Sequence, residues 1–518
     1  MLAEHVRLRA PGEHGEALQL PPISSGASMV DSNRSLLSGY PDALNSIRDL
    51  ARTEVRTLAL RYSQSYCDAS LPDATDTDAI VMAGHQPTLF HPGVWFKSFA
   101  LDSVAQAANA TAINLVVDND LSKQPAVRCP VILTGGFVDR TLSSVPFDSS
   151  AEELAFEMSQ VVDRKTFEEF GERLAQTISP LVGNPLIESL WPEVLETSGL
   201  LSMPASIAAG RHRLETKHGL SNLELPVSLL STTRSFAKFV EYLVCGASHF
   251  REIYNASLFE FRKANRIRSR SHPVPELESR EEFEEVPFWV WTRELPNRRR
   301  LFTKATHKDV EMTDFQGWSV KLSRPQLASD FQELNQLDSD VFIRPRALAT
   351  TMFSRLFASD LFLHGIGGAK YDQLGDEIAR QFFEVAPPEF MTATATMKLP
   401  FNMPSAAWEK VTQLEMELRE LRCHPDRELV GDPRALRKME LVKQRPAKGS
   451  RKSWHDEIAA INKSLFEELV MERKDLESRI AMARENQPLI KLMNSREFSF
   501  ALFPHELIEH LKVLARWR

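Results

Sequence analysis

The sequence lacks several features that mark particular classes of protein. It has only four cysteines in 518 residues, at positions 67, 129, 245 and 423, and they stand singly. Neither a CxxC metal knuckle nor a disulfide framework is therefore indicated. No run of about 18 apolar residues occurs, and the first residues lack the apolar core of a secretory signal. We expect a soluble, cytoplasmic protein whose cysteines are buried free thiols.

An excess of positive charge is also missing. The chain has 62 Lys and Arg against 70 Asp and Glu, a formal net charge of -8. General nucleic-acid-binding proteins usually carry a broad basic field that neutralises phosphates. We therefore expect no nucleic-acid partner and no membrane association. With 43% hydrophobic residues, the chain can bury a large core and divide into several domains.

What the sequence does contain is an alternation of strands and helices. Two short apolar runs, 80–82 and 113–117, flank a helix that we expect over residues 93–108. Strand, helix and strand of these lengths form a unit with parallel strands. The pattern returns in residues 340–383, where a strand at 361–363 precedes a glycine-rich turn. We predict that the three strands lie in one parallel sheet.

The segments around these two blocks suggest further domains. Residues 42–64 have apolar positions at helical spacing, residues 236–268 have the same spacing, and residues 284–304 read as two strands joined by a turn at Pro296 and Asn297. The segment 151–324 then interrupts the sheet in sequence. We predict the following division: 1–75, an N-terminal arm and helix; 76–150, the first half of the core; 151–324, a mostly helical insertion with a hairpin; 325–400, the second half of the core; 401–490, a helical arm; 491–518, a C-terminal tail.

Two charged segments near the end carry narrow apolar seams. The seam residues are Val411, Leu414, Leu418 and Leu421 in the first, and Ile458, Ile461, Leu465, Leu469, Leu476, Ile480 and Ala483 in the second. Helices with such seams form an antiparallel hairpin or an arm that pairs with a second copy, and we expect a homodimer. The basic connection, residues 434–452, is either the solvated tip of the hairpin or a patch for an anionic partner.

Two turns after predicted strands have residues suited to chemistry. They are GHQPTLFHPG from residue 84 and HGIGGAKYD from residue 364. In open α/β sheets, ligands bind beyond the carboxyl ends of strands, where a helix N-terminus attracts anions. Gly365, Gly367 and Gly368 would let the backbone approach a phosphate, and Lys370 would add a charge, but a tight structural turn explains the glycines about as well. Neither turn matches GxGxxG or a P-loop.

Other polar residues near these turns allow two interpretations. His85 and Gln86, directly after the first strand, either contact a ligand or are satisfied at the strand end. Asp118 and Asp120, after the second strand, either hold a substrate amine or a metal-bound nucleotide, or cap the next helix. Lys97, one turn into the following helix, is expected to be solvated.

The first block resembles the bacillithiol-biosynthesis cysteine-adding enzyme family. Its members carry a strand, a GQQ-type turn, Leu-Phe and a helix. Here Gly84, Gln86, Leu89 and Phe90 stand in the matching places, and His85 replaces the first Gln. An acidic cluster ends the next strand, as it does in the family.

The second block resembles the family more specifically. A strand runs into Arg344 and Pro345, and an apolar strand, a glycine turn with Gly365 and Gly367, and then Tyr371 follow. The resemblance implies an α/β fold with a Rossmann-like, nucleotidyltransferase-like parallel sheet core, a helical insertion and a C-terminal antiparallel coiled coil that dimerises. It also implies a ligase that adds cysteine to a sugar-malate acceptor, with ATP or ADP as the nucleotide.

The chain departs from the family at one turn. Family members usually have GPGE there, whereas Ile366 and Gly368 stand at the Pro and Glu positions, so a changed substrate is credible. The alternatives are a divergent nucleotidyltransferase or hydrolase on the same core, and a nonenzymatic coiled-coil scaffold. No metal ligands are indicated. His364 and Asp372 are a potential acid–base pair. The predicted catalytic residues are His85, His364 and Asp118, and the predicted substrate or nucleotide contacts are Gly84, Gln86, Asp120, Arg344, Gly365, Gly367, Gly368, Lys370 and Tyr371.

Overall fold

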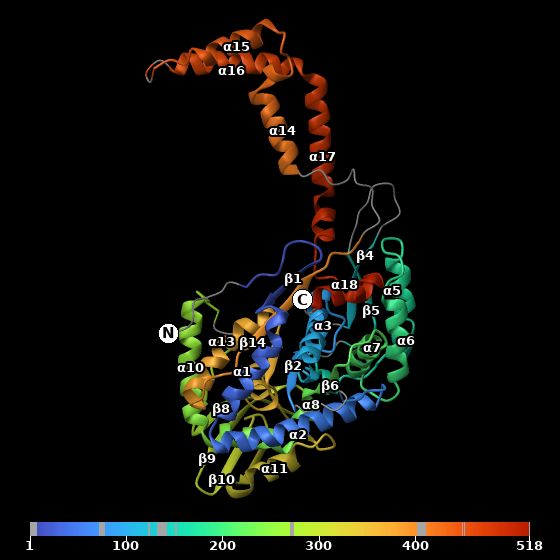
Figure 1. Cartoon of the computed structure of the whole chain (residues 1–518), viewed down its shortest axis with the longest axis vertical. Coiled ribbons are helices and arrows are strands. Elements are labelled where there is room, and N and C mark those ends of the chain that lie inside the picture. Colours follow the sequence, from blue (N-terminus) through green and yellow to red (C-terminus); the bar gives the residue numbers. More distant parts are fainter. Residues whose placement is uncertain are drawn as a thin grey trace. The chain divides into compact units, whose positions relative to one another are not determined.

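The chain divides into two compact units of helices and strands (Figure 1). The computed structural model describes residues 8–71, 78–122, 125–131, 142–150, 153–269, 274–400, 411–447, 449 and 451–516. The first unit comprises Met1–Leu399 and Arg496–Arg518, and the second comprises Pro400–Ser495.

The first unit contains all the described strands. They are β1 (Glu16–Leu20), β2 (Ile80–His85), β3 (Thr111–Val116), β4 (Ala126–Pro130), β5 (Leu142–Pro146), β6 (Leu223–Pro226), β7 (Ser279–Arg280), β8 (Phe283–Thr292), β9 (Arg299–Ala305), β10 (Asp309–Thr313), β11 (Ser319–Ser323), β12 (Val341–Pro345), β13 (Leu361–His364) and β14 (Phe390–Thr396). Its α-helices are α1 (Gly26–Ser38), α2 (Asp42–Gln64), α3 (Pro92–Ala107), α4 (Arg164–Glu168), α5 (Phe170–Ile178), α6 (Ile187–Thr197), α7 (Met203–Lys217), α8 (Val227–Leu230), α9 (Arg234–Cys245), α10 (Ala247–Ala264), α11 (Leu327–Leu334), α12 (Ala347–Phe353), α13 (Ile366–Phe382) and α18 (Glu506–Ala515).

A six-stranded sheet in the order β1-β14-β13-β2-β3-β6 forms the centre of the first unit. All neighbouring strands run parallel except β1, which is antiparallel to β14. The predicted strands 80–82, 113–117 and 361–363 are β2, β3 and β13, so their expected place in one parallel sheet is confirmed. Both faces of β2 are covered, because α3 contacts β2, β3 and β14 while α2 packs beside β3 and β6. This double cover explains why β2 and β3 read as continuous apolar runs.

Three segments lie elsewhere than the sequence indicates. β6 comes from the segment 151–324 but pairs with β3 in the central sheet, so that segment is not wholly an insertion. β12 belongs to the predicted second half of the core, yet it pairs with β8 in a second, antiparallel sheet of order β11-β10-β9-β8-β12. The N-terminal arm supplies the edge strand β1. Short strands gain their places from pairing and packing partners far away in sequence, and local pattern does not reveal those partners. The predicted hairpin is β8 and β9, which pair as expected.

The strand order reverses between β2 and β13. From β2 the chain proceeds outward to β3 and β6, and later to β13 and β14 on the opposite side. In open parallel sheets such a reversal opens a crevice beyond the carboxyl ends of the two strands, because the connecting helices lie on opposite faces. The two turns singled out in the sequence, after β2 and after β13, both lie at this point.

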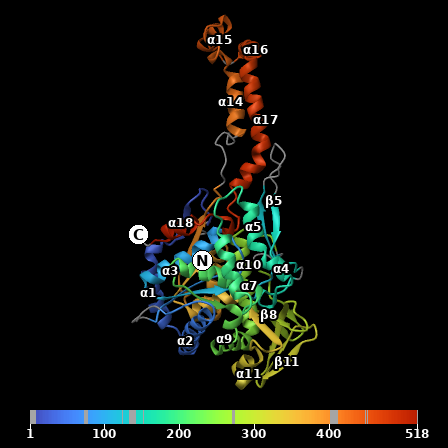
Figure 2. The same ribbon diagram turned by 90° about the vertical axis from the view of Figure 1, so that its right-hand side faces the viewer.

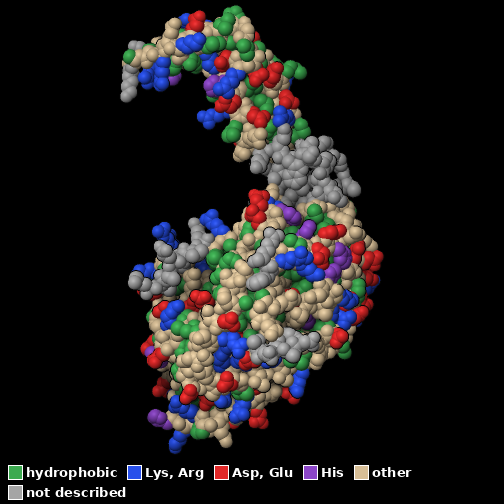
Figure 3. All heavy atoms as spheres, viewed as in Figure 1, with side chains coloured by type: hydrophobic (Ala, Val, Ile, Leu, Met, Phe, Trp, Pro, Cys, Tyr) green, Lys and Arg blue, Asp and Glu red, His purple; other side chains and the backbone are tan. Residues whose placement is uncertain are grey.

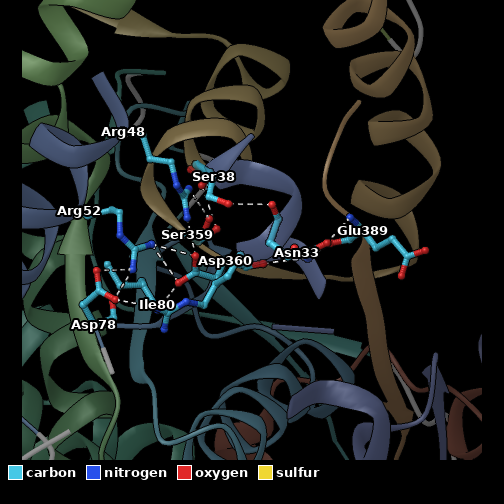
Figure 4. A network of polar contacts seen from close by, with 12 residues as sticks. Asn33, Ser38, Arg48, Arg52, Asp78, Ile80, Ser359, Asp360 and Glu389 are labelled. Carbon is cyan, nitrogen blue, oxygen red and sulfur yellow. Dashed lines mark hydrogen bonds and ion pairs between the residues drawn. The ribbon is translucent and has the colours of Figure 1, made fainter. Parts of the chain in front are cut away.

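At the amino end of β13, a buried ionic network joins the sheet to α1 and α2 (Figure 4). The carboxylate of Asp360, which is 1% exposed, accepts hydrogen bonds from Arg48, Arg52 and the backbone N–H of Ile80. Asn33 of α1 donates to the carbonyl oxygen of Asp360. A buried carboxylate with this many charged donors ties the helices to the start of the strand.

The second unit consists of helices in the described part of the chain. They are α14 (Val411–Cys423), α15 (Pro433–Lys443), α16 (Arg451–Glu468) and α17 (Val470–Met493). α14 and α17 lie side by side (Figure 1 and Figure 2). Their buried contact comprises seam residues from both helices: Val411, Leu414, Leu476, Ile480 and Ala483, with Leu418 and Leu421 at the margin.

The expected hairpin tip is largely helical. α15 occupies most of the basic segment 434–452 and packs on α16, because Ala435 and Leu441 supply a buried face. Positive, negative and apolar side chains are interspersed on the surface of this unit (Figure 3). A coiled-coil dimer through these helices stays a prediction.

Candidate active site

A cavity of about 440 Å³ lies beyond the carboxyl ends of β2, β3 and β13. It is enclosed on its other side by β8, the turn before β9, and the start of α12. The polar residues and glycines of its wall that matter below are Gly84, Lys97, Asn119, Asp120, Trp289, Arg298, Arg346, Thr351, His364, Gly365 and Gly368. The crevice at the strand reversal is therefore a cavity lined by residues from both sheets.

The cavity brings together five of the residues predicted from the sequence. Gly84 comes from the turn after β2 and Asp120 from the loop after β3, and His364, Gly365 and Gly368 come from the end of β13 and the start of α13. Both turns therefore open on the same cavity, although Gly84 and His364 are 280 positions apart in the sequence (364 − 84).

The Nε2 atom of His364 has a fixed partner, the carboxylate of Asp372. Its Nε2 lies 2.7 Å from Oδ2 of Asp372, and the same carboxylate accepts from Thr351 and Arg355. Burial alone would raise the pKa of Asp372, but Arg355 and then His364 hold it well below its usual range. An ionised Asp372 keeps the proton on Nε2, so Nδ1 is the basic atom. A Cβ at Gly368 would lie 2.7 Å from Nδ1; the glycine leaves room for this ring.

Lys97 is buried, which corrects the expectation that it is solvated. Its side chain is 6% exposed, and Nζ donates to the carbonyl oxygen of Gly84 at 2.5 Å. No carboxylate of the described residues forms an ion pair with it. Burial lowers the pKa of Lys97 to about 8. The sequence signal was its position as the only charged residue in the first two turns of an otherwise apolar helix, PGVWFKSFAL.

Arg298 and Arg346 were not expected at the site, because both are attached to the second sheet: Arg298 directly precedes β9 and Arg346 directly follows β12. An Nη1 hydrogen of Arg298 is donated to Asp120 at 3.1 Å, and Nη2 of Arg346 donates to Glu285 at 2.6 Å. Both guanidinium groups lie over the ring of Trp289, at 5.0 and 4.1 Å from its centroid. Burial lowers the pKa of Arg298, and the nearby charge of Arg346 lowers it further although Asp120 opposes this. Two cations are thus packed close together at the cavity wall.

His85 and Gln86 do not line this cavity. His85 is buried, its ring packs edge-on against Phe90, and neither ring nitrogen has a hydrogen-bond partner among the described residues. Burial, followed by the charges of Arg211 and Lys97, lowers its pKa well below the usual value. Gln86 lines a separate cavity of about 340 Å³ and donates to Asp120. Gln86 thus reaches the site only through Asp120.

Asp118 lies beneath the site rather than at its wall. Its carboxylate accepts from the backbone N–H and the hydroxyl of Ser228, at the start of α8. Burial, and then the charge of Glu157, raises the pKa of Asp118 to about 7. Arg344 is fully buried in a two-point ion pair with Glu157, at 2.8 and 2.9 Å. Both residues hold loops together beside the cavity and do not line it.

The remaining predicted contacts also fall outside the wall. Gly367 and Lys370 are exposed on α13, and Tyr371 is partly buried; none of the three lines the cavity. A Cβ at Gly365 or Gly367 would meet no atom within 4 Å, so close packing does not require these glycines.

Neither a metal site nor a membrane-spanning helix is found among the described residues. Among the described residues, no group of three or more His, Cys, Asp and Glu side chains is arranged to hold a metal ion. Within the same ranges, no helix combines the length and the apolar character needed to cross a membrane. Comparison with known proteins finds no family model that matches the chain and no curated protein that matches it significantly.

Proposed function

We propose that the chain is an enzyme that binds an anionic small molecule in the cavity at the strand reversal and joins an amino acid to it. The narrower proposal, carried by the sequence resemblance, is the joining of cysteine to a sugar-malate acceptor with ATP or ADP as the nucleotide. The observation that supports an enzyme is the convergence of five polar side chains on the cavity: His364, Lys97, Arg298, Arg346 and Asp120.

Each group has a chemical role in such a reaction. Lys97 and the two arginines attract carboxylate or phosphate groups of the substrate, and Asp120 attracts an ammonium group. Amide formation needs a base that removes a proton from the attacking amine. Nδ1 of His364 suits that role, because Asp372 fixes the orientation and tautomer of the ring.

The same observation weighs against a nonenzymatic scaffold. A scaffold has no need to hold Lys97 buried without a carboxylate partner, since an uncompensated buried charge costs stability. A nucleotidyltransferase or hydrolase on the same core stays open as the alternative, because anion-binding groups and a base serve those reactions equally. The products formed from the nucleotide distinguish these reactions.

The test is incubation of the purified protein with isotopically labelled cysteine, candidate sugar malates and ATP, followed by mass spectrometry. A ligase yields labelled conjugate together with ADP or AMP, whereas a hydrolase yields nucleotide products without conjugate. His364→Gln should lower turnover by about a hundredfold or more, and His307→Gln, at an exposed position, should not change it. Absence of both conjugate and nucleotide products would leave the scaffold as the better account.

A further inference from the structure

We propose that Arg298 and Arg346, packed on Trp289, form a subsite for a phosphate group. The inference deepens the proposed function by assigning one part of the ligand to one wall of the cavity. The inference depends on the proposal that the cavity binds the substrate, but it does not depend on which reaction takes place there.

The first observation is unused hydrogen-bonding capacity. Arg346 is 9% exposed and lines the cavity, yet its Nε and Nη1 atoms have no hydrogen-bond partner among the described residues. The Nε atom of Arg298 also has no hydrogen-bond partner among the described residues. Buried N–H groups of a guanidinium are normally satisfied, because an unmade hydrogen bond to a charged group costs stability. A ligand with several acceptor oxygens would satisfy them.

The second observation is the charge balance. The cavity wall contains three cations, Lys97, Arg298 and Arg346, and one carboxylate, Asp120. Glu285 accepts a hydrogen bond from Arg346 but does not line the cavity. It also lies 3.5 Å from Arg300, so its charge is shared between the two arginines. The charged groups of the cavity wall therefore carry a net positive charge, and the two guanidinium groups repel each other. A dianion placed between them would relieve that repulsion.

The third observation is the end of a long helix at the same wall. α13 begins after Gly365, which lines the cavity, and its N-cap has no side-chain hydrogen bond. The first N–H groups of a helix carry a partial positive charge and bind anions. The helix adds donors to those of the arginines.

The number of donors favours phosphate over carboxylate. A carboxylate offers two oxygens, whereas a phosphate monoester offers three and carries nearly two negative charges at neutral pH. Two guanidinium groups, a lysine and a helix end supply more donors than one carboxylate accepts. A dicarboxylate such as malate is the rival ligand, and direct comparison of the two separates them.

Isothermal titration calorimetry with inorganic phosphate, pyrophosphate and malate at constant ionic strength tests the assignment. We expect phosphate or pyrophosphate to bind and malate to bind more weakly. Arg298→Gln and Arg346→Gln should each weaken phosphate binding by about tenfold or more, because each removes charged hydrogen bonds. Arg293→Gln should bind as the unmodified protein does, since Arg293 is half exposed and does not line the cavity.

Arg346→Lys provides a second variant if Arg346→Gln does not fold. It keeps a charge for Glu285 but loses the planar fork of donors, and weaker phosphate binding is again expected. Phosphate binding that is absent, or unchanged in all these variants, would overturn the subsite. Malate binding tighter than phosphate, and lost in the same variants, would overturn the choice of phosphate. If phosphate binds as expected and no conjugate forms in the ligation assay, the reaction fails while the subsite stands.

Discussion

Replacement of Lys97 by Met should stabilise the protein at neutral pH. The pKa of Lys97 is lowered from 10.5 to about 8 by burial, so the unfolded chain binds the proton more tightly. Below pH 8 both states are charged and the full cost of burying the ammonium is present. As the pH rises from 8 to 10.5, the unfolded state holds more protons than the folded state, and stability increases. The difference of 2.5 pH units, at about 1.4 kcal/mol each, is about 3.5 kcal/mol.

Met fills a similar volume without a charge. The substitution removes the hydrogen bond from Lys97 to Gly84, which offsets about 1 kcal/mol of the gain. We therefore expect a net increase of about 2.5 kcal/mol in the free energy of unfolding at pH 7. At pH 10.5 the deprotonated lysine no longer carries the cost, so the advantage of Met should disappear.

Equilibrium urea unfolding at pH 7 and pH 10.5 measures both quantities, provided that the dependence on urea is the same for both proteins. Lys370→Met is the matched control, because Lys370 is exposed on α13 and surface changes usually stay within about 0.5 kcal/mol. Lower stability of Lys97→Met at pH 7, or the same difference at both pH values, would refute the reasoning. A variant that is more stable but binds phosphate less well would show that the chain keeps this charge for its ligand.

Three further substitutions test other parts of the structure. Asp360→Asn should lower the free energy of unfolding by about 3–5 kcal/mol, because it leaves the buried Arg48 without its carboxylate and Arg52 with Asp78 alone, and urea unfolding that matches the original protein would contradict this. Asp118→Asn keeps the capping hydrogen bonds. Because the pKa of Asp118 is raised to about 7, the original protein should lose stability as the pH rises from 4 to 7, and the variant should not. Thermal melting at several pH values measures this difference. Gly368→Ala should displace His364 and reduce turnover by about tenfold or more, whereas Gly367→Ala, with open space around it, should not; equal effects in an activity assay would argue against the base.

The sequence predicted the central strands because their pattern depends on local burial. β2 and β3 are covered on both faces, so each reads as an apolar run with a helix between them. The same reasoning located the two turns, with His364 in the second of them, and Asp120 after β3. It could not locate β1 and β6, because short strands become edges of the sheet only through pairing with strands far away in sequence.

The missed half of the site came from a wrong assumption about charged residues. Arg298 and Arg346 lie in segments that look like ordinary surface loops, since nothing in NRRR or RPRA indicates that Trp289 and a second sheet cover them. Lys97 looked solvated because most helical lysines are. Its apolar neighbours on every side of α3 were the available signal, since a helix that is buried all round buries its charged residues as well.

Because of this topology, the two sheets supply different groups to the cavity. His364, Asp120 and the start of α13 follow strands of the central sheet, where position depends on backbone pairing, and Lys97 lies in α3, which packs on that sheet. The second sheet supplies the arginines, and its attachment to the first decides how close they come to His364. A ligand held by both sheets would therefore stabilise their contact as well as its own binding, by about 2.7 kcal/mol at a hundred times its Kd. The repulsion between the cations works against that contact when no anion is present. If the phosphate subsite is as proposed, this repulsion is the stability that the first unit gives up in order to bind an anion.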